Sequence, residues 1–175
     1  YGGHRQALTS GSWEVLRAEL SPARDRFLLT TSETSPYEEQ FWTMRLDGGE
    51  RRQMTSTVGA HAVSVSPDGR WFADVHSTSN RPPELFLQPA RTGAAATQLT
   101  TSPTAEWLAQ RWIEPEIITI PASDGVQVPA RIYRPEQVGA RGNGAAVLFV
   151  HGAGYLHNVH NYWSDYFREY QFHHL

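Results

Sequence analysis

The stretch Val65-Ser66-Pro67-Asp68-Gly69-Arg70-Trp71-Phe72 has a counterpart 45 residues earlier, Leu20-Ser21-Pro22-Ala23-Arg24-Asp25-Arg26-Phe27. The same spacing continues beyond these two stretches. It aligns Ser32 with Ser77, Glu39 with Glu84, Phe41 with Phe86, Gly48 with Gly93, Gln53 with Gln98 and Thr55 with Thr100. So many matches in phase indicate a duplicated structural unit.

Each unit is typical of short strands separated by turns. The second begins with an apolar pair before Ser66-Pro67, then has a Pro-Asp-Gly turn, a strand over 71–76, a polar loop and a strand over 84–88. A Gly turn and a short Gln-Leu-Thr strand complete it. Four strands in 40 to 45 residues are characteristic of a β-propeller blade. No 3.6-residue apolar pattern favours a helical repeat.

The first residues, Gly3 to Thr9, look like the end of such a unit, comparable with Gly49 to Thr55. We therefore expect residues 1–112 to hold two nearly whole blades and the outer strand of an earlier blade. Closed propellers use about four to eight blades. We accordingly expect the remainder of the same protein, or another chain, to cover the open propeller and sheet edges.

The repeat stops after Thr100, and a different pattern follows. Two alternating strands around Ser123-Asp124-Gly125 predict a β-hairpin. A continuous apolar run over 145–150 then predicts a strand buried on both faces, as in an α/β sheet. A Gly-rich loop and a helix from about Asn161 are expected next, with Trp163 among the apolar residues at helical spacing.

The composition limits the classes of partner. The net charge is -3 with both signs interspersed, so no basic stripe favours nucleic acid, and no apolar run is long enough for a membrane span. The absence of cysteine excludes disulfides and thiolate zinc sites. The chain begins with neither an initiator methionine nor a leader segment, and a signal peptide could have been removed without trace. The compartment therefore stays open, and we prefer the periplasm or secretion to the cytoplasm.

The combination of these motifs resembles a known family. The Ser-Pro-Asp-Gly type blades, followed by 118–125, by Arg131-Ile132-Tyr133-Arg134-Pro135 and by Phe149-Val150-His151-Gly152-Ala153-Gly154-Tyr155, are similar to the prolyl oligopeptidase (S9) family of serine peptidases, particularly its dipeptidyl peptidase IV-like branch. The resemblance implies a propeller over residues 1–112 and the truncated N-terminal part of an α/β-hydrolase domain over residues 113–175.

The resemblance also implies an activity, namely hydrolysis of peptide substrates by a Ser-His-Asp triad, often after proline or alanine, with no cofactor. In α/β hydrolases the nucleophile lies in a Gly-x-Ser-x-Gly elbow, followed by the aspartate and the histidine. The sequence contains no such elbow. We therefore expect all three triad residues downstream of Leu175, no catalytic residue within the chain, and no peptidase activity from this polypeptide alone.

The Gly-rich loop is the one catalytic element that the resemblance places within the chain. Loops of the His-Gly type after this strand supply backbone N–H donors to an oxyanion, and the candidate amides are those of Gly152, Ala153 and Gly154. In the prolyl oligopeptidase and dipeptidyl peptidase IV branches a tyrosine of this loop supplies a donor where this chain has His151. Tyr155 is a candidate for that role, and the alternative is that His151 and Tyr155 only orient the loop.

Other interpretations of the same residues remain. A non-enzymatic propeller that binds a protein or peptide would explain the blades, and an esterase would share the hydrolase loop. Histidines 151, 157, 160, 173 and 174 lack the His-Glu-x-x-His form of a zinc hydrolase, so we expect surface histidines and no metal site. Glu38-Glu39 invites comparison with the glutamate pair that anchors substrate amines in dipeptidyl peptidases, but its place inside the repeat favours a solvated loop.

Overall fold

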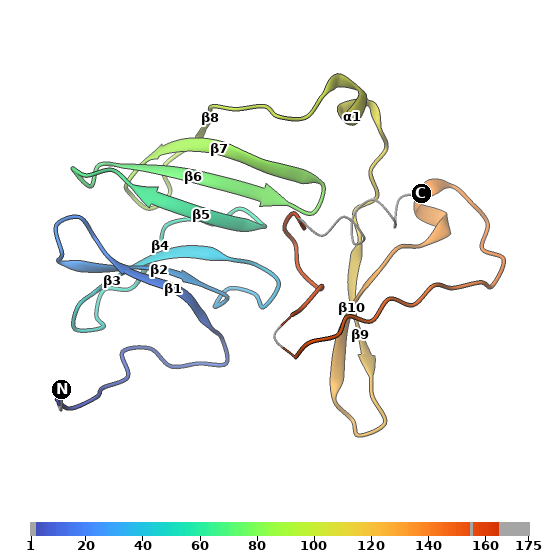
Figure 1. The fold of residues 1–175 in the computed structure, drawn as a ribbon, viewed down its shortest axis with the longest axis horizontal. Coiled ribbons are helices and arrows are strands. Elements are labelled where there is room, and N and C mark those ends of the chain that lie inside the picture. The colour runs from blue at the N-terminus through green and yellow to red at the C-terminus, as the bar shows by residue number, and fades with distance from the viewer. Residues whose placement is uncertain (1–2, 155, 165–175) are drawn as a thin grey trace.

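Two four-stranded antiparallel sheets and a separate hairpin make up the fold (Figure 1). The computed structural model describes residues 3–154 and 156–164. The first sheet contains β1 (Val15–Leu20), β2 (Arg26–Thr31), β3 (Gln40–Arg45) and β4 (Arg52–Gln53). The second contains β5 (Ala60–Val65), β6 (Trp71–Thr78), β7 (Arg81–Pro89) and β8 (Thr97–Gln98), and the hairpin contains β9 (Glu116–Pro121) and β10 (Gln127–Ile132). The helical elements are α1 (Ala105–Ala109) and the 3₁₀ turn η1 (Pro135–Val138).

Each of the two four-stranded sheets is a meander in which consecutive strands are neighbours. This is the arrangement of a propeller blade. The strands predicted at 71–76 and 84–88 and the hairpin predicted around Asp124 are confirmed. The second Ser-Pro turn is fixed by Asp68, whose carboxylate accepts hydrogen bonds from Ser66 Oγ at 2.6 Å and from the Arg70 amide at 3.1 Å. The repeat is therefore a repeat of blades.

The third strand of the second blade departs from the 45-residue spacing. Arg26 pairs with Arg45 in the first blade, whereas its counterpart Trp71 pairs with Pro89, one residue earlier than that spacing predicts. The connection from β6 to β7 is shorter by one residue, with a register shift between His76 and Thr78, and the turn before β8 is longer by one. Phe41 and Phe86 are therefore not structural equivalents, because a one-residue slip reverses the face on which a side chain lies.

The two blades pack face to face through a small apolar core. Phe41 comes from the first blade, Met54 from the linker that follows β4, and Val63 and Phe72 from the second blade. The rings of Phe41 and Phe72 meet edge to face, with centroids 5.2 Å apart. Burying each such side chain stabilises the junction by roughly 1.5–3 kcal/mol. Leu28, Val65 and Ala90 are partly buried and pack against this core.

The predicted outer strand at the start of the chain is not formed. Residues 3–10 adopt no regular structure, and a Cβ on Gly48 would lie 3.2 Å from the carbonyl oxygen of Leu8. The chain that follows these residues contacts the first blade through Trp13. The guanidinium of Arg51 lies 5.1 Å from the ring centroid of Trp13 and 5.5 Å from that of Trp42. A strand needs a partner for its backbone groups, and no described strand pairs with this segment.

The predicted buried strand over residues 145–150 is also not formed among the described residues. The segment is irregular, and Val147 and Leu148 are 97% and 85% exposed. A strand that is buried on both faces requires neighbouring strands and covering helices, and no described strand pairs with it. Of the helix predicted from Asn161, residues 161–164 are described and form no helix, and the rest lies outside the described residues.

One short helix was not predicted. Helix α1 begins after Thr104, whose Oγ1 accepts a hydrogen bond from the Trp107 amide at 3.2 Å. The indole of Trp107 stacks on that of Trp112, with centroids 3.9 Å apart. No helix among the described residues is both long and apolar enough to cross a lipid bilayer.

Candidate functional site

The Gly-rich loop lies on the surface of the described structure. Ala153 has a positive φ of 59°, and its carbonyl accepts a hydrogen bond from the Leu156 amide at 3.1 Å. Nδ1 of His151 lies 2.8 Å from the carbonyl oxygen of Gly152, so the tautomer protonated at Nδ1 orients the loop. A Cβ on Gly152 or Gly154 would meet no described atom within 4 Å. Tyr155 lies outside the described residues.

The segment after this loop returns to the propeller blades. The Asn161 amide donates to the carbonyl of Tyr37 at 2.8 Å, and the Trp163 amide donates to Ser77 Oγ at 3.4 Å. Between them, His160 is buried, and its ring stacks on Tyr162 with centroids 4.0 Å apart. Residues 158–163 therefore hold the Gly-rich loop close to the blade ends where β2 and β6 finish (Figure 1).

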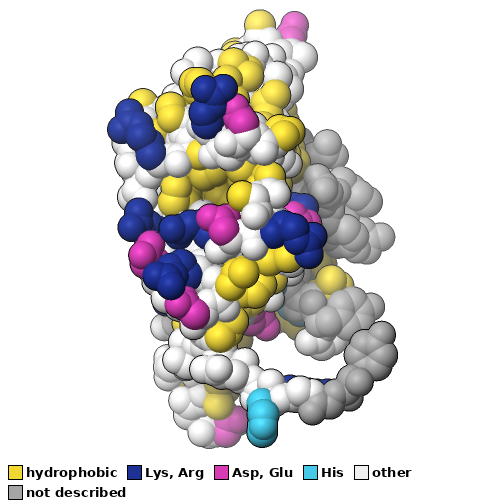
Figure 2. All heavy atoms as spheres, turned by 90° about the vertical axis from the view of Figure 1, so that its left-hand side faces the viewer, with side chains coloured by type: hydrophobic (Ala, Val, Ile, Leu, Met, Phe, Trp, Pro, Cys, Tyr) yellow, Lys and Arg dark blue, Asp and Glu magenta, His cyan; other side chains and the backbone are white. Residues whose placement is uncertain are grey.

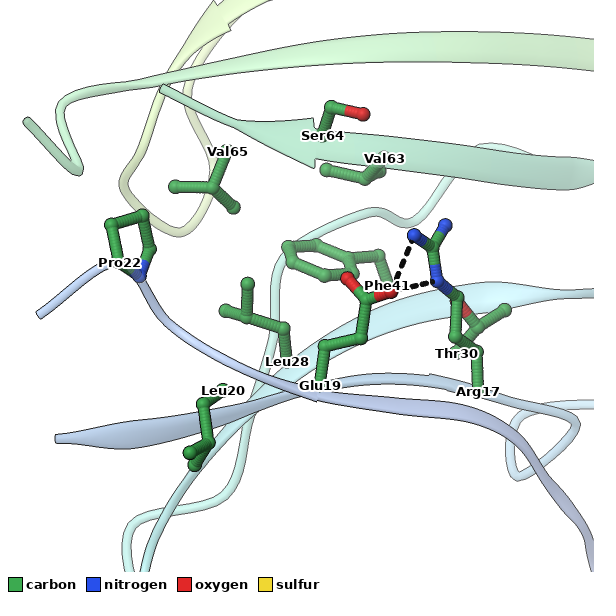
Figure 3. Close-up of a pocket in the computed structure, with 10 residues that line it drawn as sticks. All are labelled: Arg17, Glu19, Leu20, Pro22, Leu28, Thr30, Phe41, Val63, Ser64 and Val65. Atoms are coloured by element: carbon green, nitrogen blue, oxygen red, sulfur yellow. Dashed lines mark hydrogen bonds and ion pairs between the residues drawn. The ribbon is translucent and has the colours of Figure 1, made fainter. Parts of the chain in front are cut away.

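A cavity of about 270 Å³ opens between the two blades at the other end of their junction (Figure 3). Arg17 and Glu19, both on β1, border it and pair with each other at 2.6 Å. The remaining lining is mainly apolar and comes from both blades: Leu20, Pro22, Leu28, Thr30, Phe41, Val63, Ser64 and Val65. The paired side chains of Arg17 and Glu19 are half-exposed, and the volume of the cavity suits a small group.

A second cavity, of about 280 Å³, lies beside the linker that follows the blades. It is lined by Pro82, Ser102, Pro103, Thr104, Trp107 and Trp163. The indoles of Trp107 and Trp163 are tilted at 59° with centroids 5.5 Å apart. Neither this cavity nor the one between the blades includes a residue of the Gly-rich loop.

The sequence interpretation missed one polar cluster, which is centred on His61. Nδ1 of His61 lies 2.7 Å from Oδ2 of Asp74, and Nε2 of His61 lies 3.2 Å from Oγ1 of Thr57 and 3.0 Å from its carbonyl oxygen. The order carboxylate, imidazole, hydroxyl is that of a hydrolase triad. The His61 and Asp74 side chains, however, are only 2% and 5% exposed, and neither cavity reaches them. The cluster therefore ties β5 and β6 of the second blade to the linker at Thr57, and it is not a catalytic site.

A signal for this cluster was present in the strand pattern. His61 and Val63 alternate on β5, as Phe72 and Asp74 do on β6, and all four are buried. Two polar residues in the inward register of adjacent strands indicate a buried hydrogen bond. Which of them meet depends on the register, and the sequence did not provide it.

The glutamate pair lies at the same junction. Oε2 of Glu38 accepts a hydrogen bond from Gln40 Nε2 at 2.9 Å, and Glu39 forms an isolated parallel bridge with Ala60. Both residues are half-buried, which corrects the predicted solvated loop. Glu39 contacts the second blade, whereas Glu38 bonds within the first. Within the described ranges no group of three His, Asp or Glu side chains is placed to hold a metal ion, and the rings of His157 and His160 are 6.0 Å apart.

The stacked meanders define adjacent blades of a β-propeller. Residues 2–83 match the family described as "Dipeptidyl peptidase IV (DPP IV) N-terminal region". The fold is similar to the crystal structure of Porphyromonas gingivalis dipeptidyl peptidase 4, with a TM-score of 0.69 and 16% sequence identity over 95% of this chain and 24% of that chain. The chain thus spans about a quarter of the length of that protein. Residues 2–83 thus resemble the N-terminal region of dipeptidyl peptidase IV, and the fold of the described residues is that of propeller blades.

Proposed function

We propose that the full-length protein carrying this chain is a serine peptidase of the dipeptidyl peptidase type. The observation that carries the proposal is the family match over residues 2–83. The order of elements supports it, because the blades are followed by a hairpin, an apolar run and a His-Gly-Ala-Gly loop. The chain contributes propeller blades and the first part of a hydrolase domain, whose triad is supplied by residues outside it.

In this proposal the reaction is acyl transfer. A serine hydroxyl attacks the scissile carbonyl, a histidine takes its proton and returns it to the leaving amine, and an aspartate orients the histidine. The carbonyl oxygen becomes an oxyanion that N–H groups of the loop stabilise. The amides of Gly152, Ala153 and Gly154 are the candidate donors in this chain. The apolar run over residues 145–150 then forms its strand beside the neighbouring strands of the complete hydrolase sheet.

The open faces of the blades support an incomplete propeller. Trp71 and Val75 of β6 are directed away from the first blade and are exposed, and Leu99 beyond β8 is exposed as well. Apolar side chains on one face of a sheet are normally covered by a neighbouring layer. Further blades of the same protein are the cover that this proposal assigns.

The activity is tested with the full-length protein and an aminoacyl-prolyl or aminoacyl-alanyl chromogenic substrate. Release of the chromophore, with loss of activity after labelling by a serine-directed fluorophosphonate, is the expected result. Hydrolysis of simple esters without hydrolysis of peptides would favour an esterase, and binding of peptides without hydrolysis would favour a propeller binding module. Residues 1–175 alone are the control, and we expect no hydrolysis from them.

The oxyanion assignment has a separate test. Tyr155→Phe and His151→Phe each remove a side-chain donor and leave the backbone amides in place. If one of these side chains donates to the oxyanion, its variant lowers kcat by roughly 10²–10³-fold with little change in KM. Unchanged kcat in both variants would leave the backbone amides as the donors and restrict these side chains to orienting the loop.

A further inference from the structure

The linker between the blades, residues 54–59, is held by side chains from both of them. Gln40 Nε2 from the first blade donates to the carbonyl of Thr57 at 2.8 Å. From the second blade, Nε2 of His61 lies 3.0 Å from the same carbonyl oxygen, and Nε2 of His76 lies 2.9 Å from that of Val58. The linker position therefore depends on two imidazoles.

These two imidazoles are stacked on each other. The ring centroids of His61 and His76 are 4.4 Å apart, and the planes differ by 14°. The edge-to-face contact of Phe86, at 5.7 Å, covers another side of His76. His61 already uses the Asp74 carboxylate as its hydrogen-bond partner. A positive charge on His76 would therefore lie against the His61 ring and would not have this carboxylate to itself.

The charged and titratable groups around His76 come from every neighbouring strand. They are His61 on β5, Asp74 on the same strand β6, and Glu84 and Arg81 on β7, with Glu84 directly opposite His76 in the register. Glu84 is already bonded to Thr100 and Ser102. Burial is the main cause that lowers the pKa of His76, and the charges of His61 and Arg81 lower it further. The Val58 carbonyl and Asp74 raise this pKa, but it stays below 6.5.

The same end of β6 holds the segment that follows the Gly-rich loop. Ser77, next to His76, accepts the hydrogen bond from the Trp163 amide. Gly59 at the end of the linker packs so closely on Ser77 that an added Cβ would lie 2.0 Å from the Ser77 carbonyl oxygen. We therefore expect a displacement of the linker to disturb the contact that anchors residues 158–163.

We propose that His76 makes the blade junction a pH-sensitive joint, in which protonation of its imidazole loosens the linker 54–59 and the contact of Ser77 with the 158–163 segment. The joint opens more often in acid than at neutral pH.

The direction of the effect follows from proton linkage. A histidine whose folded-state pKa is below its unfolded value of 6.5 binds fewer protons when folded. Its stabilisation is therefore complete above pH 6.5 and is lost as the pH falls from 6.5 through the folded-state pKa. The equilibrium constant for local opening should rise by up to about tenfold between pH 7.5 and pH 5.5.

The test is hydrogen exchange of the full-length protein, read from peptides that cover residues 54–65 and 71–78, with exchange times scaled for the intrinsic effect of pH. His76→Gln keeps an N–H donor for the Val58 carbonyl but cannot be protonated, so we expect its opening constant to change less than twofold over this range. His4→Gln, which alters an exposed histidine far from the joint, is the matched control and should follow the wild type.

Equal pH dependence in the wild type and in His76→Gln would overturn the proposal. If His76→Gln does not fold, the wild type alone decides it through the deuterium exchange of the His76 imidazole C2 hydrogen, which reports the pKa of that ring. An opening constant of residues 54–65 that rises as this ring becomes protonated supports the joint, and an opening constant that stays the same through its titration overturns it.

Discussion

Gln40 and Glu84 occupy equivalent positions in the two blades, and each binds the threonine that follows the last strand of its blade. Oγ1 of Thr55 donates to Gln40 Oε1 at 2.7 Å, and Oγ1 of Thr100 donates to Glu84 Oε2 at 2.5 Å. In both blades the threonine oxygen then accepts a backbone amide of the third strand at 2.8 Å. Glu84 differs in also accepting hydrogen bonds from the amide and hydroxyl of Ser102, and so ties the linker to the blade.

Glu84→Gln should destabilise the second blade, and the effect should depend on pH. Burial raises the pKa of Glu84, but the hydrogen bonds from Ser102 and Thr100 outweigh burial, and the pKa lies below 4.5. The contribution of the carboxylate is therefore present above pH 4.5 and is lost as the pH falls below it. We expect a loss of about 1–2 kcal/mol at pH 7 that shrinks at pH 3, measured by urea denaturation. Exposed Glu136→Gln is the control, and a loss independent of pH would contradict this role.

The fold was predictable where it rests on local chemistry. The Ser-Pro turns and the Asp-Gly hairpin occur where their turn residues lie. The 45-residue spacing aligned the third strands of the two blades wrongly by one residue. It matched Glu39 with Glu84 and Phe41 with Phe86 by identity, whereas the hydrogen-bond register depends on the lengths of the connections between strands. Gln40, not Glu39, is therefore the counterpart of Glu84.

The candidate site was less predictable because it depends on distant contacts. Residues 145–150 have the apolar pattern of a buried strand, yet a central strand acquires its form only from neighbours on both sides. The pairing of His61 with Asp74 likewise required the register of β5 against β6. His160 was expected on the surface and is buried, because residues 158–163 return to the blades.

Gly59→Ala should disrupt the junction far more than the same substitution at Gly93. Both glycines have a positive φ, at 127° and 71°, but only the Cβ at position 59 would lie 2.0 Å from a backbone oxygen, while that at position 93 meets nothing within 4 Å. We expect Gly93→Ala to cost about 1 kcal/mol for its conformation and Gly59→Ala to cost about 3 kcal/mol or more. The temperature dependence of unfolding of the two variants measures the difference, and equal losses would show that the linker shifts freely.

The Ser-Pro turns offer a reciprocal pair of substitutions. Arg24 adopts a φ of 58°, and Gly69, its counterpart 45 residues later, has a φ of 70° with open space at its Cβ. A side chain in this region costs about 1 kcal/mol relative to glycine. We therefore expect Arg24→Gly to raise the melting temperature by about 2–4 °C and Gly69→Ala to lower it by a similar amount. Changes of the same sign in both variants would contradict the equivalence of the turns.

Asp74→Ala should be the most damaging polar substitution at the junction. It leaves Nδ1 of His61 buried without the carboxylate that lies 2.7 Å away, and a buried group deprived of its charged partner costs about 3 kcal/mol or more. Asp74→Asn retains an acceptor oxygen and should cost about half as much. Glu19→Gln, which breaks the half-exposed pair with Arg17, is the matched control and should cost less than about 1 kcal/mol. Hydrogen exchange of the peptides that contain β5 and β6 gives the local opening free energies of the Asp74 variants, and exchange of the peptide that contains β1 gives that of Glu19→Gln. An Asp74→Ala loss no larger than that of Glu19→Gln would show that the buried pair does not hold β5 to β6.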